Sequence, residues 1–203
     1  IPDFAISSRS GVKSVLLFSE LPIEELMGVS IGFSGNGETT PALLRILCNF
    51  RYGFEPKIVP ESTQAELVIG DEALMAVAQK RWEGWHVTDL AELWTEWTKL
   101  DFVFAVWIVR RDFVENPNFS KTLTALRESK AWGMSHRPEV IREAQQTLPL
   151  PGDFLASYFG SIQYSLDGKC IQGLNHFYEL AAELAIIPHP VKVENLLHVR
   201  TLL

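Results

Sequence analysis

The sequence predicts an α/β fold, and three observations carry this prediction. Short apolar runs alternate with segments of helical periodicity in the first half of the chain. One run, FVFAVWIV at residues 102–109, is continuous and rich in β-branched and aromatic residues, as in a strand buried on both faces. After Arg111 helical signals continue with no strong strand signal. Strands separated by crossover helices favour parallel pairing, which places a ligand outside the carboxyl ends of the strands.

The first half of the chain is predicted to hold five strands and three helices. The strands span residues 14–19, 29–33, 57–59, 67–69 and 102–109. The helices span residues 41–51, 71–80 and 89–98, with a short helical turn at 21–26. Leu43, Leu44, Leu47 and Phe50 recur at helical spacing in the first helix, and Gly53 is placed to end it.

The second half is predicted to be helical. Helices are expected at about residues 120–132, 137–147, 152–159 and 167–185. Pro138 suits the first turn of its helix, and Pro149 and Pro151 punctuate the gap before the next one. In the last helix, Phe177, Leu180, Ala181 and Leu184 fall on one face, which indicates a side that packs on a core.

Length and charge narrow the classes of function. The chain has 203 residues, which suits one large domain or two small lobes. Its formal net charge is -7, which argues against nucleic acid or an anionic membrane as partner, because both attract basic patches. An anionic small molecule stays possible, since a local site can oppose the sign of the whole protein.

Cysteine content and hydropathy give the expected compartment. Cys48 and Cys170 are too few for a disulfide framework and lack metal-ligand spacing, and the five histidines form no His-x-x-x-His pair. We therefore predict no metal site and a reducing, cytoplasmic location. No stretch approaches the roughly 20 apolar residues of a membrane span. The chain starts at Ile1 without a signal-peptide pattern, and we expect further sequence to precede it.

The loop GFSGNGETTPALL, residues 32–44, is the first candidate for a binding site. It is glycine-rich and places Thr39 and Thr40 at the start of a helix. Either threonine is predicted to be the N-cap, with Pro41 at the first helical position. Free backbone N–H groups and the helix dipole would bind a carboxylate or phosphate there. An ordinary capped helix is the alternative, and the Lys and glycine spacing of a P-loop are missing.

The segment VIGDEAL, residues 68–74, is the second candidate. Gly70 lies between a buried strand and a helix, and Asp71 lies in the first helical turn. A glycine there leaves room for a ligand to approach the backbone. The alternative is purely structural, because acidic residues in a first turn complement the helix dipole.

These stretches, taken in order, resemble the chorismate dehydratase family of the futalosine route to menaquinone. The resemblance rests on ISSRSGVKSVLLFSELP, TTPALLRIL, LVIGDEAL, LWTEWTKLDFVFAVWIVRR and IQYSLDGKCIQGLNHFYELAAELAII. It runs from about residue 3 to residue 188. Each motif is weak alone, but the ordered set is specific. The sequence departs from the family pattern at residues 10–12, where Ser-Gly-Val replaces the usual Gly-Pro-Val, and at residues 98–101.

The resemblance implies the fold and the reaction. The fold would be two-lobed and similar to type II periplasmic binding proteins, with a ligand cleft between two α/β lobes. The reaction would convert chorismate to 3-[(1-carboxyvinyl)oxy]benzoate and water without a cofactor, as a carbon–oxygen lyase. The serine-rich stretch at residues 7–14 would then cross between the lobes at the cleft floor.

The resemblance also implies site residues. Ser8 and Ser14 would present hydroxyl groups to substrate, and Thr39 and Thr40 would meet a substrate carboxylate. Gly70 stands where a related family, which processes cyclic dehypoxanthinylfutalosine, carries a catalytic histidine, so a cyclase is disfavoured. Ser14 and, more weakly, Asp71 are the catalytic candidates. A substrate carboxylate is the alternative base.

The resemblance divides the chain into three parts. Residues 1–13 would be the remainder of lobe one with the crossover, residues 14–109 would form lobe two, and residues 110–203 would return to pack on lobe one. Family members begin with a βα segment that nothing before Ile1 matches, so we expect this chain to be the remainder of a longer protein. The alternative function is a non-catalytic solute-binding protein of the same fold for a small carboxylate.

Overall fold

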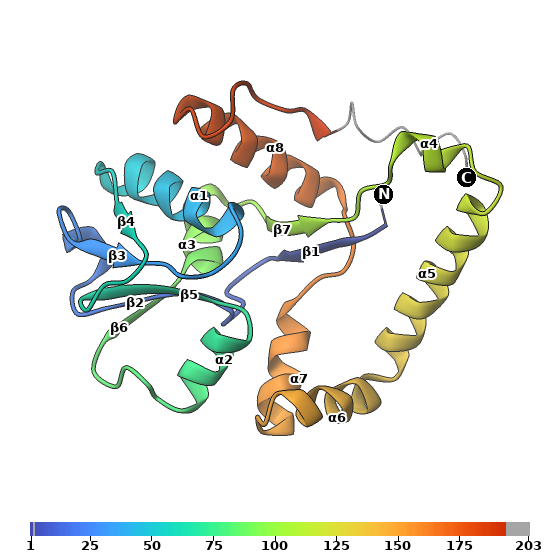
Figure 1. The fold of residues 1–203 in the computed structure, drawn as a ribbon, viewed down its shortest axis with the longest axis horizontal. Helices are drawn as coiled ribbons and strands as arrows, with labels where there is room; N and C mark the ends of the chain where they lie inside the picture. The colour runs from blue at the N-terminus through green and yellow to red at the C-terminus, as the bar shows by residue number, and fades with distance from the viewer. Residues whose placement is uncertain (2, 194–203) are drawn as a thin grey trace.

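The computed structural model describes residue 1 and residues 3–193 (Figure 1). Its larger sheet has five strands in the order β4-β3-β5-β2-β6. The strands are β2 (Val15–Ser19), β3 (Ser30–Gly32), β4 (Lys57–Val59), β5 (Ala65–Ile69) and β6 (His86–Asp89). Four of them overlap segments predicted as strands, with β5 beginning two residues earlier than predicted, and β6 was not predicted. The mixed α/β character predicted from the sequence is therefore confirmed.

Strand directions in this sheet are mixed, so the parallel pairing that the sequence favours holds for β3 but not for β2. β3 is parallel to β4 and to β5. β2 lies between β5 and β6 and is antiparallel to both. β1, the strand before β2, belongs to the two-stranded sheet, so no crossover connection fixes the direction of β2 relative to its partners β5 and β6.

Helices cover both faces of the sheet, and alternate residues of β2 point into the two cores. On one face Leu17 packs with residues of α1 (Thr39–Ile46), α3 (Leu90–Thr98) and α8 (Gly168–Glu183). On the other face Leu16 and Phe18 pack with α2 (Asp71–Ala78). A π-helical turn (Leu47–Arg51) extends α1, and a 3-10 turn (Ile23–Glu25) follows β2. All five residues of β2 are buried as a result.

A two-stranded ribbon leads away from the sheet, as Figure 1 shows. It pairs β1 (Ala5–Ser8) with β7 (Phe102–Val106) in antiparallel register. The prediction of a strand at residues 102–109 buried on both faces was wrong, because β7 ends at Val106 and Ile108 is 87% exposed. A two-stranded ribbon lacks the neighbours that would cover a second face. The covered face packs on α8, where Ala5 and Val103 contact Leu174.

The remaining helices follow β7. They are α4 (Arg111–Val114), α5 (Phe119–Ser135), α6 (Arg137–Thr147) and α7 (Gly152–Ser161). All but α4 were predicted. Leu148, Leu150 and Leu155 pack with Leu74 of α2, so α7 and the loop before it lie against the helix that follows β5. The division at residues 1–13, 14–109 and 110–203 stays a proposal, and residues 194–203 lie outside the described residues.

Candidate functional site

Ser14 and Gly70 meet at one edge of the five-stranded sheet. Val15 at the start of β2 pairs with Ile69 at the end of β5. Just beyond this pair, the Gly70 N–H donates a hydrogen bond of 2.8 Å to the Ser14 carbonyl oxygen. The carboxyl ends of β3, β5 and β6 point to the same edge, because β2 is antiparallel to β5 and β6 and β3 is parallel to β5. This is the edge at which α/β sheets bind ligands.

Gly70 has a backbone conformation that side chains rarely adopt. Its φ is +65° and its ψ is -139°, and it is the N-cap residue of α2. A Cβ atom added there would meet no atom within 4 Å. The space at this position is therefore open, and the glycine is required by the backbone.

The two serine candidates are both buried but differ in their hydroxyl contacts. Ser14 is 8% exposed. Ser8 is fully buried in β1, and its hydroxyl donates to the Ser10 carbonyl oxygen and accepts from the Ser10 N–H at 3.0 Å. The Ser8 hydroxyl is thus engaged within a local turn. Its contact with substrate stays a prediction, as does that of Ser14.

The start of α1 differs from the prediction. Glu38 is the N-cap, and Thr39 and Thr40 are the first two helical residues, so neither threonine caps the helix and Pro41 is the third helical residue. Glu38 already has helical backbone angles, φ -98° and ψ -25°, which moves the boundary one residue earlier. Within the described part of the chain, neither threonine hydroxyl has a hydrogen-bond partner. Both are half-buried and free to donate to an anion.

Asp71 is the first residue of α2 and is exposed. Its neighbour Glu72 forms an ion pair with Arg81 at 2.9 Å. The position of Asp71 matches the predicted first turn, where a carboxylate complements the helix dipole. A role as base stays a prediction.

Asp89 is a residue that sequence analysis missed at this edge. Its Oδ1 atom accepts from the N–H groups of Ala91 and Glu92 and so caps α3. Its Oδ2 atom accepts from the N–H groups of Val12 at 2.7 Å and Lys13 at 2.8 Å. One carboxylate therefore fixes the loop between β1 and β2 against the sheet. Only the capping half of this role has a sequence signal, namely an acidic residue just before a helical pattern.

Replacing Asp89 by asparagine is expected to lower the free energy of unfolding by about 2 kcal/mol. The amide oxygen can still cap α3, but the amide N–H groups would then face the N–H donors of Val12 and Lys13. Urea unfolding measures the change. Asp89→Ser is the control, since serine keeps a cap and introduces no opposing donor. Equal stability of Asp89→Asn and the unmodified protein would show that the loop between β1 and β2 does not depend on this carboxylate.

A partly buried polar cluster joins the residues after β1 and before β7 to the start of α8. Asp101, Asp167 and Cys170 place possible metal-ligand atoms within 4.8 Å of one another. Arg9, however, pairs with Asp101 at 3.3 Å and with Asp167 at 2.9 Å. Burial raises the pKa of the Cys170 thiol, whereas metal binding needs the thiolate. The cluster is thus an ionic tie between elements and does not fit a metal.

The pKa of Asp167 is lowered, first by the hydrogen bond from the Cys170 N–H and also by those from Lys169 and Arg9. A lowered carboxyl pKa adds stability that is fully present above the unfolded pKa of about 3.9 and is lost as the pH falls through the folded pKa. Asparagine can also cap a helix, so replacing the N-cap residue Asp167 by asparagine removes the charge and keeps the cap. Asp167→Asn is therefore expected to be less stable at pH 7 by up to about 1 kcal/mol. In urea unfolding this gap should shrink below about pH 4, and a gap independent of pH would contradict the assignment.

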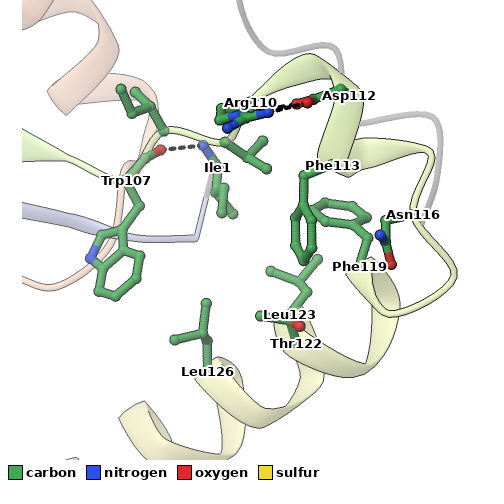
Figure 2. Close-up of a pocket in the computed structure, with 12 residues that line it drawn as sticks. Ile1, Trp107, Arg110, Asp112, Phe113, Asn116, Phe119, Thr122, Leu123 and Leu126 are labelled. Carbon is green, nitrogen blue, oxygen red and sulfur yellow. Dashed lines mark hydrogen bonds and ion pairs between the residues drawn. The ribbon is translucent and has the colours of Figure 1, made fainter.

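Two of the cavities formed by the described residues lie beside Trp107 and α5. One of about 550 Å³ is bounded by Trp107, Phe113, Phe119 and Leu126, with an Arg110–Asp112 ion pair at its rim (Figure 2). A second of about 440 Å³ shares Trp107 and Leu126 with it. Both are mainly apolar, and none of the predicted site residues lines either one.

Comparisons with known proteins identify relatives over nearly the whole chain. A family model described as menaquinone biosynthesis matches residues 1–183. The sequence is 30% identical over 200 residues to a chorismate dehydratase of Thermus thermophilus, covering 88% of this chain and 72% of that protein.

Two solved structures share the fold. An Archaeoglobus fulgidus protein matches with a TM-score of 0.63 and 20% identity over 92% of this chain and 72% of its own. The periplasmic aliphatic sulphonate binding protein of Escherichia coli matches with a TM-score of 0.52 and 15% identity over 95% of this chain and 72% of its own. The fold is therefore of the periplasmic-binding-protein type.

Proposed function

Because the chain belongs to the menaquinone biosynthesis family, we propose that it is a chorismate dehydratase. The Thermus thermophilus relative of that name supports the activity. The proposed site rests on the Gly70–Ser14 hydrogen bond, which joins two of the predicted residues at one edge of the sheet. The strand β3, which leads to α1, also ends at this edge. We further propose that the reaction belongs to the futalosine route.

The proposed reaction is an elimination of water. Chorismate loses its ring hydroxyl group and the hydrogen on the neighbouring carbon, which bears the enolpyruvyl ether. The C–H electron pair becomes part of the new aromatic ring, the C–O bond breaks, and the proton and hydroxide leave as water. The reaction is redox-neutral, so its balance requires no oxidant or reductant, and the enzyme class is a hydro-lyase. Aromatisation drives the step, which leaves orientation and proton transfer to the protein.

The sheet edge can supply these functions with neutral groups. The N-terminal N–H groups of α1 and the hydroxyls of Thr39 and Thr40 bind one substrate carboxylate. Ser14 orients the ring, and Gly70 lets the ring approach the backbone. The proton acceptor is either Asp71 or a carboxylate of the substrate. In the second case the proton transfer is intramolecular.

The proposed partner is this small molecule, without nucleic acid or membrane. No helix in the described residues is long and apolar enough to cross a membrane. The cytoplasmic location stays a proposal that rests on the sequence.

The function is tested by incubating the protein with chorismate and identifying the product by ultraviolet absorbance and mass. The expected product is 3-[(1-carboxyvinyl)oxy]benzoate, lighter than chorismate by one water. Circular dichroism must first show that the protein is folded. Folded protein that binds chorismate without releasing this product would instead support the alternative, a solute-binding protein of the same fold.

A further inference from the structure

Lys13 lies at the candidate site in a constrained backbone conformation. It immediately precedes Ser14, and its φ of +59° is in the left-handed region. Such a conformation is uncommon for a residue other than glycine. Here it is held by the hydrogen bond from the Lys13 N–H to Asp89. The Asp89 carboxylate therefore fixes the point from which the Lys13 side chain leaves the crossover.

The Lys13 side chain reaches toward α7. Its ammonium group donates to the Ser157 hydroxyl at 3.2 Å and lies 5.6 Å from the centre of the Phe154 ring. Lys13 is exposed, and among the described residues no carboxylate lies within ion-pair distance of it. Arg9 and Arg81, by contrast, are paired with carboxylates. Lys13 thus keeps an unneutralised charge beside the candidate site.

The charges around the candidate site favour a role for Lys13 in binding an anion. The proposed substrate is a dianion, the protein carries a net charge of -7, and the helix starts at this edge bear the carboxylates Glu38 and Asp71. The start of α1 supplies neutral donors for one substrate carboxylate but no cation. A hydrogen bond between an exposed ammonium group and a neutral hydroxyl contributes little, so it is readily exchanged for a charge-assisted bond to a carboxylate.

We propose that Lys13 binds the second carboxylate of the substrate and so selects for dicarboxylates. This inference rests on the proposed function and adds a residue to its site. Lys13 leaves the Ser157 hydroxyl when the ligand enters, while Asp89 keeps its backbone in place. The α1 end of the site and Lys13 then each hold one of the two carboxylates.

Binding of the product 3-[(1-carboxyvinyl)oxy]benzoate, measured by titration calorimetry, tests the inference without requiring turnover. Lys13→Asn removes the charge but keeps a residue that tolerates the left-handed region. We expect it to bind the product about tenfold more weakly, at the low end for a charge-assisted bond because the site is exposed. Lys13→Arg should stay within about threefold of the unmodified protein. The affinity of the unmodified protein should fall with salt more steeply than that of Lys13→Asn.

Two variants separate this role from general effects of charge and packing. Lys99→Asn removes the same charge from another left-handed lysine, which caps the far end of α3. Ser157→Ala removes only the Lys13 contact on α7. Both should bind the product as the unmodified protein does.

The outcomes are distinct. Equal product affinity of Lys13→Asn and Lys99→Asn overturns the inference, as does an equal loss in Ser157→Ala, which would make Lys13 a brace to α7. A protein that binds no product at all also overturns it. Absent turnover of chorismate together with weaker product binding in Lys13→Asn would refute the dehydratase function while supporting Lys13 as a carboxylate ligand.

Discussion

Gly70→Leu is expected to lower kcat/KM for chorismate about a hundredfold or more while leaving the circular dichroism spectrum nearly unchanged. Leucine fits the open space, but its backbone resists φ of +65° and ψ of -139°, at a cost of about 1–3 kcal/mol. The chain relieves this strain by shifting the Gly70–Ser14 contact and the start of α2. A shift of about 1 Å at a site that works by orientation is enough for this loss.

Gly84→Leu is the matched control for this variant. Gly84 also has a positive φ, +90°, with no atom within 4 Å of an added Cβ, and it lies in the loop between α2 and β6. It carries the same kind of backbone strain outside the candidate site. Full activity of Gly70→Leu would place Gly70 outside the site, and an equal loss in Gly84→Leu would show that the effect is general destabilisation.

The double variant Thr39→Ala/Thr40→Ala is expected to lose about ten- to a hundredfold in kcat/KM, because one charge-assisted hydrogen bond to a carboxylate contributes about 1.5–3 kcal/mol. Folding stability should change by less than about 0.5 kcal/mol, since Glu38 is the N-cap and alanine is a better helix former than threonine. Steady-state kinetics and urea unfolding measure the two effects.

Thr98→Ala serves as the control for the threonines. Its hydroxyl donates to the Trp94 carbonyl oxygen at the far end of α3, so its loss should affect stability and not kinetics. If the double variant keeps normal kinetics and loses only stability, the start of α1 is a helix terminus with no anion site.

Most elements of the fold were predictable from local patterns. The helical spacing of Leu43, Leu44 and Leu47 predicted α1 and its π-helical extension, and Gly53 predicted where that extension ends. Periodicity and backbone conformation are local properties. The direction of β2 was not predictable, since its partners β5 and β6 lie far along the chain and the strand before it belongs to another sheet. The predicted strand extended past Val106 because the residues there are apolar, and apolar residues predict burial. The two-stranded ribbon instead ends at Val106 and leaves Ile108 exposed.

The candidate site was predictable only in part. Gly70 stood out because a glycine between a strand and a helix indicates a backbone conformation that other residues rarely adopt. Glu38, and neither threonine, is the N-cap of α1. The sequence does not fix the start of a helix to within one residue, because that boundary depends on local backbone angles. Asp89 and Lys13 were missed because their roles arise from a contact between residues 76 positions apart.

We propose that chorismate is bound and dehydrated at the edge formed by Ser14, Gly70 and the start of α1. A crystal structure of the protein with 3-[(1-carboxyvinyl)oxy]benzoate would locate the product. We expect one carboxylate within hydrogen-bond distance of Thr39, Thr40 or the first N–H groups of α1, and the ring over Gly70. Product bound instead in the cavity between Trp107 and α5, with this edge empty, would place the active site elsewhere.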